Sequence, residues 1–205
     1  MEAIEGVLTH AQGFFYDESL QTRITLRVNG DIMYWPDNRM VANGKSLSQF
    51  RYLLLSNRGE IANADAHVLF TAHAILKALG VAPDDLPKGD AFVGFATFDT
   101  VCDPNYKGVS ILERINANGS GQSMIRFFLH ELGHNLGMSH DGVVEKYFGL
   151  PKGTCKKTKN KIMGRKDWEN WTPRPYVWTA CNRCNLLRSY HKKMIQTGEY
   201  CMDRS

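Results

Sequence analysis

The sequence predicts a mixed α/β (α+β) fold, built as a single domain over residues 1–205. Short segments that alternate polar and apolar residues predict strands, and longer segments with apolar residues three or four apart predict helices. A chain of 205 residues is long enough to bury one core, and 43% hydrophobic with 22% charged residues is typical of a globular domain. No internal repeat or low-complexity tract indicates a second domain.

The first half of the chain is predicted to alternate strands and helices. Residues 22–28 alternate polar and apolar side chains, and a turn signal at 29–31 precedes residues 32–35, so these segments predict a hairpin or one bulged strand. Ser46 is expected to cap a helix that ends at about residue 56. Residues 65–79 are apolar enough for a buried strand followed by a short helix.

The second half is predicted to contain two strands at residues 91–98 and 108–112, two helices at 122–136 and 179–195, and loops at 83–87 and 151–175. The first of these helices has an apolar face, formed by Met124, Ile125, Phe128, Leu129, Leu132 and Leu136. One face of this helix should therefore be buried.

The segment HELGHNLGMSHD contains the residue types of a catalytic zinc site. His130 and His134 lie four residues apart, so they project from one face of a helix and can share one metal ion. Gly137 allows the chain to leave the helix with a positive φ, and His140 then provides a third ligand. Three protein ligands leave a fourth position open for water, which is typical of catalytic zinc sites.

Glu131 is the predicted general base, because it adjoins the first ligand and lies within reach of a zinc-bound water. It is expected to take a proton from the attacking water and pass it to the departing amine. The alternative is an amphipathic core helix in which His130 and His134 are buried core residues. That alternative does not explain Gly137 or His140, so the metal site is the preferred interpretation.

The motif HExxHxxGxxH, followed downstream by a methionine, resembles the metzincin clan of zinc endopeptidases. Asp141 directly after the third histidine resembles the reprolysin (adamalysin) family, which includes snake-venom metalloproteinases and the protease domains of ADAM proteins. Lys161-Ile162-Met163-Gly164 is similar to the methionine turn of that family. Three further segments are similar to family segments in the same order, namely DAHVLFT at 65–71, GFA to Cys102 at 94–102, and WTACN at 178–182.

The resemblance implies a metzincin-like fold, in which a twisted, mainly parallel sheet with an antiparallel edge strand lies over the zinc helix. A cleft is expected between residues 1–137 and a smaller subdomain at 138–205. The family's first strand and long helix are not recognised before Glu5, so we expect a fragment or a shortened core that lacks one strand. Because the family's calcium site takes a glutamate from that strand, Asp65 is left as the candidate Ca²⁺ ligand.

The resemblance also implies roles for residues outside the zinc motif. Gly94, Phe95 and Ala96 belong to the expected edge strand, to which an extended peptide substrate adds as a further strand. Met163 is expected to pack beneath the histidines without binding zinc, because thioether sulfur is a weak partner for Zn²⁺. Asp141 is expected to brace the turn that carries the third ligand, through buried hydrogen bonds.

The five cysteines are Cys102, Cys155, Cys181, Cys184 and Cys201. The pair Cys181-x-x-Cys184 is a weak signal for a structural zinc site or a redox pair, because no second metal-spaced pair accompanies it. The resemblance implies that Cys102 pairs with Cys201, and that Cys155 pairs with either Cys181 or Cys184. One cysteine is then left over.

Cysteine content and two glycosylation sequons, at Asn118 and Asn170, predict a secreted, extracellular protein. Residues 1–5 lack the features of a signal peptide, which is consistent with a mature or truncated form. No segment is long and apolar enough to span a membrane, and no nucleic-acid-binding motif is present. The basic residues at 152–166 are interpreted as a solvated loop, or as a patch that attracts acidic polysaccharide or an anionic substrate.

These observations predict a zinc-dependent endopeptidase that acts on extracellular matrix or plasma proteins. By association, the basic loop and the short chain would suit a secreted venom or salivary toxin. The alternative is a binding module that uses a protease scaffold to engage a receptor or matrix protein. A zinc-dependent amidase acting on small molecules is disfavoured, because the expected edge strand resembles that of an endopeptidase.

Overall fold

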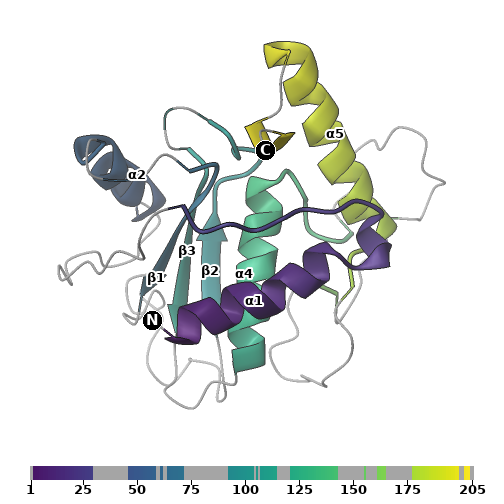
Figure 1. Cartoon of the computed structure of the whole chain (residues 1–205), viewed down its shortest axis with the longest axis horizontal. Helices are drawn as coiled ribbons and strands as arrows, with labels where there is room; N and C mark the ends of the chain where they lie inside the picture. Colours follow the sequence, from purple (N-terminus) through teal and green to yellow (C-terminus); the bar gives the residue numbers. More distant parts are fainter. Residues whose placement is uncertain are drawn as a thin grey trace.

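The computed structural model describes residues 2–29, 46–58, 61, 64–71, 92–103, 105, 107–114, 121–142, 155, 161–164, 177–198 and 201–203. Its elements follow the order α1 (Glu2–Phe15), η1 (Glu18–Leu20), α2 (Ser46–Ser56), β1 (His67–Thr71), β2 (Phe92–Ala96), β3 (Val109–Arg114), α4 (Gly121–Asn135), α5 (Ala180–Thr197) and η3 (Cys201–Asp203). Figure 1 shows α1 crossing in front of α4, with α5 on the far side of the sheet from α2.

The described sheet has β3 in the middle, with β1 and β2 on either side. β1 runs parallel to β3, with His67 opposite Val109, whereas β2 runs antiparallel to it, with Gly94 opposite Leu112. The strands predicted at residues 91–98 and 108–112, and the antiparallel strand at the edge, are therefore confirmed. Among the described residues no strand precedes β1.

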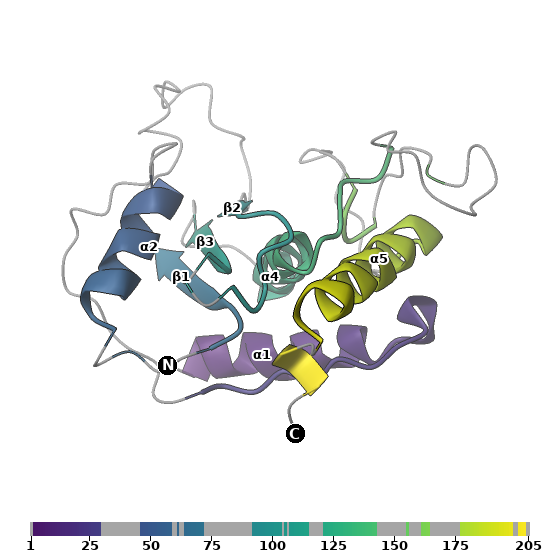
Figure 2. The same cartoon turned by 90° about the horizontal axis from the view of Figure 1, so that it is seen from above.

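Helices cover both faces of this sheet, as Figure 2 shows by placing the strands between α2 and α4. Alternate residues of β3 point to opposite faces. Val109 and Ile111 pack with Phe50 and Leu54 of α2, while Leu112 belongs to the larger cluster on the side of α4. The zinc-motif helix is thus held against the sheet, and the mixed α/β fold class is confirmed.

α1 occupies a region in which no helix was predicted, and leaving this helix out was wrong. Val7, Ala11 and Phe15 are buried in the cluster that contains the apolar face of α4. Their spacing of four residues places them on one face of α1. The apolar contact with α4 compensates for Gly6 and Gly13, which lower the helix propensity of the segment.

The prediction of a strand at residues 22–28 is also wrong, since the described part of this segment contains no strand. The side-chain amide of Gln12 takes up its backbone groups: Nε2 donates to the Ile24 carbonyl at 2.7 Å, and Oε1 accepts from the Leu26 N–H at 2.6 Å. These bonds replace those of a neighbouring strand. The segment follows α1 back towards α2 (Figure 1).

The helices predicted at residues 46–56, 122–136 and 179–195 are confirmed as α2, α4 and α5. The strand predicted after Asp65 is confirmed as β1, whereas residues 32–35, 72–79 and 83–87 lie outside the described residues, as do both sequons. None of the helices in the described ranges is both long and apolar enough to cross a lipid bilayer.

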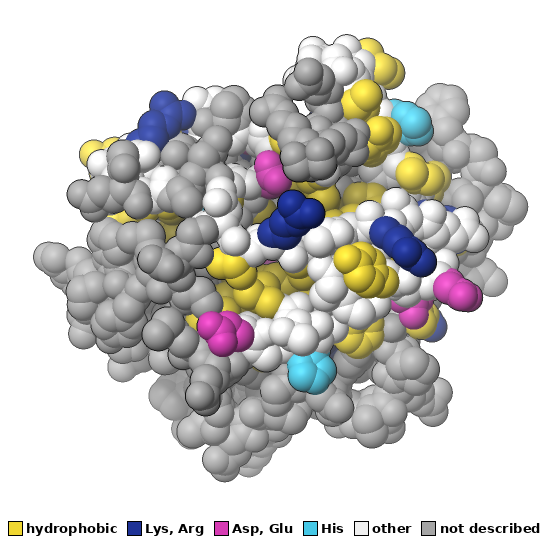
Figure 3. All heavy atoms as spheres, in the orientation of Figure 1, with side chains coloured by type: hydrophobic (Ala, Val, Ile, Leu, Met, Phe, Trp, Pro, Cys, Tyr) yellow, Lys and Arg dark blue, Asp and Glu magenta, His cyan; other side chains and the backbone are white. Residues whose placement is uncertain are grey.

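The face of the molecule in Figure 3 has hydrophobic side chains across its centre, with charged side chains of both signs scattered singly around them. Only residues 155 and 161–164 of the basic stretch at 152–166 are described. The patch proposed for acidic partners therefore stays a prediction.

Candidate metal centre

Three histidines converge at the end of α4 and the turn that follows it. Nε2 of His140 lies 3.0 Å from Nε2 of His130 and 3.2 Å from Nε2 of His134. All three residues are half-buried, and their candidate ligand atoms lie within 4.8 Å of one another. The spacing within α4 brings the first two together, and the turn returns the third to the same point.

Backbone carbonyl groups orient the two helical histidines. Nδ1 of His130 donates to the Ile162 carbonyl at 2.7 Å, and Nδ1 of His134 donates to the Met138 carbonyl at 2.8 Å. Because a carbonyl oxygen can only accept, each Nδ1 holds the proton and each Nε2 presents a lone pair. Burial lowers the pKa of His130 to about 3 and that of His134 to about 4, so both rings are neutral at pH 7.

This arrangement fits a bound cation. Two bare Nε2 atoms face Nε2 of His140, which can donate a proton to only one of them. A metal ion removes the repulsion between the remaining lone pairs. Three neutral imidazole nitrogens are a donor set that Zn²⁺ prefers, and they leave its fourth tetrahedral position open.

The side chain of Glu131 projects from α4 towards the edge strand β2. Its side chain is only 5% exposed and packs against the backbone of Gly94. Burial raises the pKa of the Glu131 carboxyl from 4.5 to about 8. A carboxyl with a pKa near neutrality can both accept and release a proton at physiological pH.

The turn after α4 depends on a glycine. Gly137 has a φ of 87°, in the left-handed region that glycine adopts freely, which confirms the predicted helix end. Its N–H donates to the His134 carbonyl at 2.9 Å, and the Met138 N–H donates to the Gly133 carbonyl at 2.8 Å. This pair of bonds is typical of a glycine helix C-terminus and directs the chain back towards His140.

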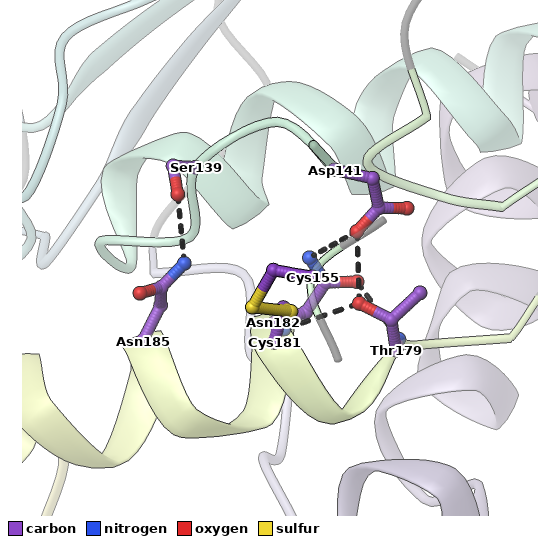
Figure 4. The surroundings of a disulfide bond; sticks show 7 residues. All are labelled: Ser139, Asp141, Cys155, Thr179, Cys181, Asn182 and Asn185. Atoms are coloured by element: carbon purple, nitrogen blue, oxygen red, sulfur yellow. Dashed lines mark hydrogen bonds between the residues drawn. A yellow bond between two sulfur atoms is a disulfide. The ribbon is translucent and has the colours of Figure 1, made fainter. Parts of the chain in front are cut away.

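Asp141 joins this turn to α5, as Figure 4 shows. Its Oδ1 accepts from the Thr179 hydroxyl at 2.8 Å and from Asn182 Nδ2 at 3.2 Å, and its backbone N–H donates to the Met163 carbonyl at 2.9 Å. Asp141 is 2% exposed, so these are buried contacts. They are the kind of contact expected of a residue that braces the third ligand.

Met163 is fully buried and lies against Gly133, in the turn of α4 between His130 and His134. A Cβ atom added to Gly133 would lie 2.7 Å from its sulfur, so the absence of a side chain at Gly133 lets Met163 approach the helix. The sequence interpretation did not single out Gly133. Its position between His130 and His134 is the signal that could have identified it.

The cysteines form two disulfides, Cys102–Cys201 and Cys155–Cys181, while Cys184 is free. The second disulfide lies beside the hydrogen bonds of Asp141 (Figure 4). Asp65 lies near Cys102 and Cys201 in a second group of candidate metal ligands. Because both of these sulfurs are in a disulfide, the group offers one carboxylate, and Ca²⁺ binding at Asp65 stays a prediction.

Sequence reasoning missed two residues that hold β2 against the end of α4. Asn135 Nδ2 donates to the carbonyls of Thr97 and Val109, at 2.8 and 3.1 Å. The Asp99 N–H donates to the His134 carbonyl at 2.9 Å, while its carboxylate accepts hydrogen bonds from Ser189 and Lys192 of α5. These partners lie far apart in the sequence, so no local pattern indicates the contacts.

Comparison with protein families gives two matches. Residues 1–141 match the metallo-peptidase family M12B reprolysin-like description, and residues 86–202 match the reprolysin (M12B) family of zinc metalloproteases. Both matches include the three histidines and Glu131. A search of curated proteins finds no match. The convergent histidines and these two matches agree, and the chain belongs to the reprolysin (M12B) family of zinc metalloproteases.

Proposed function

We propose that this chain is a zinc-dependent endopeptidase that hydrolyses peptide bonds of extracellular proteins. The observation that carries the proposal is the convergence of His130, His134 and His140 beside the buried carboxyl of Glu131. Family membership supports a zinc peptidase. The edge strand next to Glu131 supports a polypeptide as the substrate.

Zn²⁺ held by these histidines would supply Lewis-acid chemistry, activating water and polarising the scissile carbonyl. The protein's contribution is to bring three imidazole nitrogens together at one point. The hydrogen bonds from Nδ1 of His130 and His134 to backbone carbonyls fix both rings, so little reorganisation is needed when the metal enters.

Glu131 is the proton acceptor and donor of the proposed reaction. Its carboxylate takes a proton from the attacking water and delivers it to the nitrogen of the departing amine. Burial supports this role, because it holds the carboxyl against Gly94 and away from bulk water.

β2 provides the proposed binding edge for an extended peptide. In the described sheet, β3 occupies one side of β2, which leaves the other side available for backbone hydrogen bonds. Gly94 faces Glu131, so a peptide paired with β2 would pass beside the carboxylate. Phe98 is half exposed, with its ring centre 6.4 Å from that of His134, and would contact a substrate side chain next to the metal.

We place the protein outside the cell, with matrix or plasma proteins as the proposed substrates. Two disulfides support this setting, because disulfides persist in oxidising compartments and are rare in the cytosol. Cleavage of peptide libraries would measure the sequence preference around the scissile bond and so narrow the choice of substrate within that class.

The deciding experiment is cleavage of casein or gelatin by the purified zinc-loaded chain, with and without a chelator, for the wild type and Glu131→Ala. We expect the chelator and the substitution each to abolish cleavage, with the variant still folded and its zinc content unchanged. Glu5→Ala, which changes an exposed glutamate of α1, is the matched control and should cleave normally. Cleavage by Glu131→Ala at close to the wild-type rate would overturn the assignment of the base. If the wild type is folded and zinc-loaded but inactive, the proposed endopeptidase function is overturned and the binding-module alternative is favoured.

A further inference from the structure

Gly94 of the edge strand lies directly against the side chain of Glu131 in the zinc-motif helix. A Cβ atom added to Gly94 would overlap Cγ of Glu131 and lie 2.5 Å from Oε1 and 2.6 Å from Cδ. Three atoms of one side chain would therefore be displaced by a single methyl group. Such separations are far inside ordinary van der Waals contact.

The backbone of Gly94 does not itself require glycine. The described glycines with positive φ are Gly137, Gly142 and Gly198, so Gly94 lies in a region that other residues adopt. It is paired within the sheet, opposite Leu112 of β3. Glycine in a strand interior lowers strand stability and often marks a close approach. Here the close approach is to the Glu131 side chain.

The Glu131 side chain has little room to move away. It is 5% exposed, and the overlap includes Cγ, whose position is set by rotation about the Cα–Cβ bond and does not change when the carboxylate alone rotates. Its neighbour His130 is held by the Ile162 carbonyl, so a shift of α4 would also move a candidate metal ligand. A side chain at position 94 therefore forces either a new Glu131 rotamer or a displaced β2.

We propose that Gly94 is a positioning residue: its missing side chain forms the slot that holds the carboxylate of Glu131 in place for proton transfer. This role rests on the proposed function, because Gly94 acts through Glu131. It differs from the part first expected of Gly94, in which the strand only binds the peptide backbone. Gly94 would then both pair with the substrate backbone and leave room for the Glu131 carboxylate.

Kinetics of Gly94→Ala on a peptide substrate test this role. We expect kcat to fall on the order of 10²-fold, the cost of misplacing a reacting group by about an ångström, while KM changes by less than about 3-fold. Zinc content should remain that of the wild type. Gly13→Ala in α1 is the matched control, because a Cβ there meets nothing within 4 Å, and it should leave kcat unchanged.

A double-mutant cycle on thermal unfolding of the metal-free protein separates positioning from general damage to β2. Gly94→Ala should lower Tm by about 5 °C in the wild-type background, but by less than about 1 °C in Glu131→Ala, where the overlapping atoms are gone. This readout needs no activity, so it still tests the contact if the endopeptidase proposal fails. Equal losses in both backgrounds, or a kcat within about 3-fold of wild type, would overturn the role of Gly94.

Discussion

His130 and His134 reach the metal site from one helix, whereas His140 reaches it from a turn held by distant parts of the chain. The first two are placed by the four-residue spacing of α4, which packs against the sheet. The third depends on Asp141, whose contacts come from Met163, Thr179 and Asn182. The same set of candidate ligands is therefore built from one local and one long-range arrangement.

Substitutions should disturb these two arrangements in different ways. A helix keeps two ligands in register whenever it is folded, so substitutions around α4 should act mainly through the ligands themselves. The turn keeps its shape only while its hydrogen bonds to α5 remain, so substitutions in α5, which holds no ligand, should weaken metal binding. Substitutions of the histidines and of the residues that hold the turn test this distinction.

We call His130 and His134 on α4 the helical half of the site, and His140 with its turn the long-range half. The largest expected effect on zinc affinity comes from removing a candidate ligand from either half. His134→Ala and His140→Ala should each lower zinc affinity by more than the roughly 10–100-fold that loss of a supporting residue costs. Competition with a chromogenic chelator measures both. His10→Ala, at an exposed histidine of α1, should bind zinc like the wild type. A loss below about 10-fold in either ligand variant would contradict that ligand assignment.

Asp141→Ala tests the long-range half without removing a ligand. The substitution leaves the Thr179 hydroxyl and the Asn182 amide without their buried acceptor, so we expect a loss of about 2–4 kcal/mol in the free energy of unfolding. Zinc affinity should fall about 10–100-fold. Denaturant unfolding and the chelator competition measure the two effects.

The control for Asp141→Ala is Asp103→Ala, which removes a partly exposed carboxylate paired with Lys107 at 3.2 Å. That pair should contribute less than about 1 kcal/mol, and its loss should leave zinc affinity unchanged. If Asp141→Ala bound zinc as tightly as the wild type, the turn would hold its shape without the contacts to α5, and the two halves would not differ.

The helical half was predictable from the sequence because its information is local. The spacing of His130 and His134, the apolar face of their helix and the glycine at its end all lie within one segment, and each is present in the structure. The contacts that brace the turn could be expected only through family resemblance, because Asp141 and Thr179 are 38 residues apart. The rings are oriented by the backbone carbonyls of Ile162 and Met138. Every residue has a backbone carbonyl, so these contacts cannot be recognised from the amino acids at those positions.

The same distinction explains the errors of fold prediction. Residues 22–28 alternate like a strand, but alternation does not reveal which groups pair with the backbone, and here Gln12 supplies them from α1. α1 has its apolar residues at helical spacing, yet Gly6 and Gly13 lower its propensity, and only burial against α4 makes the helix stable. Both errors concern contacts between segments.

The helical half should also govern the pH dependence of the metal-free protein. Glu131 has a pKa of about 8 when folded and 4.5 ordinarily, so between these values the folded state holds more protons and stability falls as pH rises. The pKa values of His130 and His134 are lowered from 6.5, so their contribution is present above pH 6.5 and is lost as pH falls towards about 3–4.

Between pH 6.5 and 8 Glu131 makes the largest of these three contributions, because the two histidines are already half deprotonated in the unfolded state at pH 6.5. Relative to Glu131→Gln, which lacks the titrating group, metal-free wild type should lose about 2 kcal/mol of unfolding free energy across that interval, at about 1.4 kcal/mol per pKa unit. The variant itself should become slightly more stable there, as the remaining protonation of the unfolded histidines is lost. Denaturant unfolding at several pH values measures both proteins, and an equal decline in the variant would mean that another group is responsible.

The smallest effect, and the finest test of the long-range half, is Thr179→Ala. The Thr179 hydroxyl accepts from the Asn182 N–H at the start of α5 and donates to Asp141, so one atom links the helix cap to the turn. We expect a loss of about 1–2 kcal/mol in unfolding free energy, with Thr179→Ser close to wild type because it keeps the hydroxyl. In an Asp141→Ala background the same substitution should cost only the capping part, about 1 kcal/mol or less, because the bond to the turn is already gone. Full additivity of the two substitutions would show that the cap and the turn are independent, and that the third ligand needs no support from the start of α5.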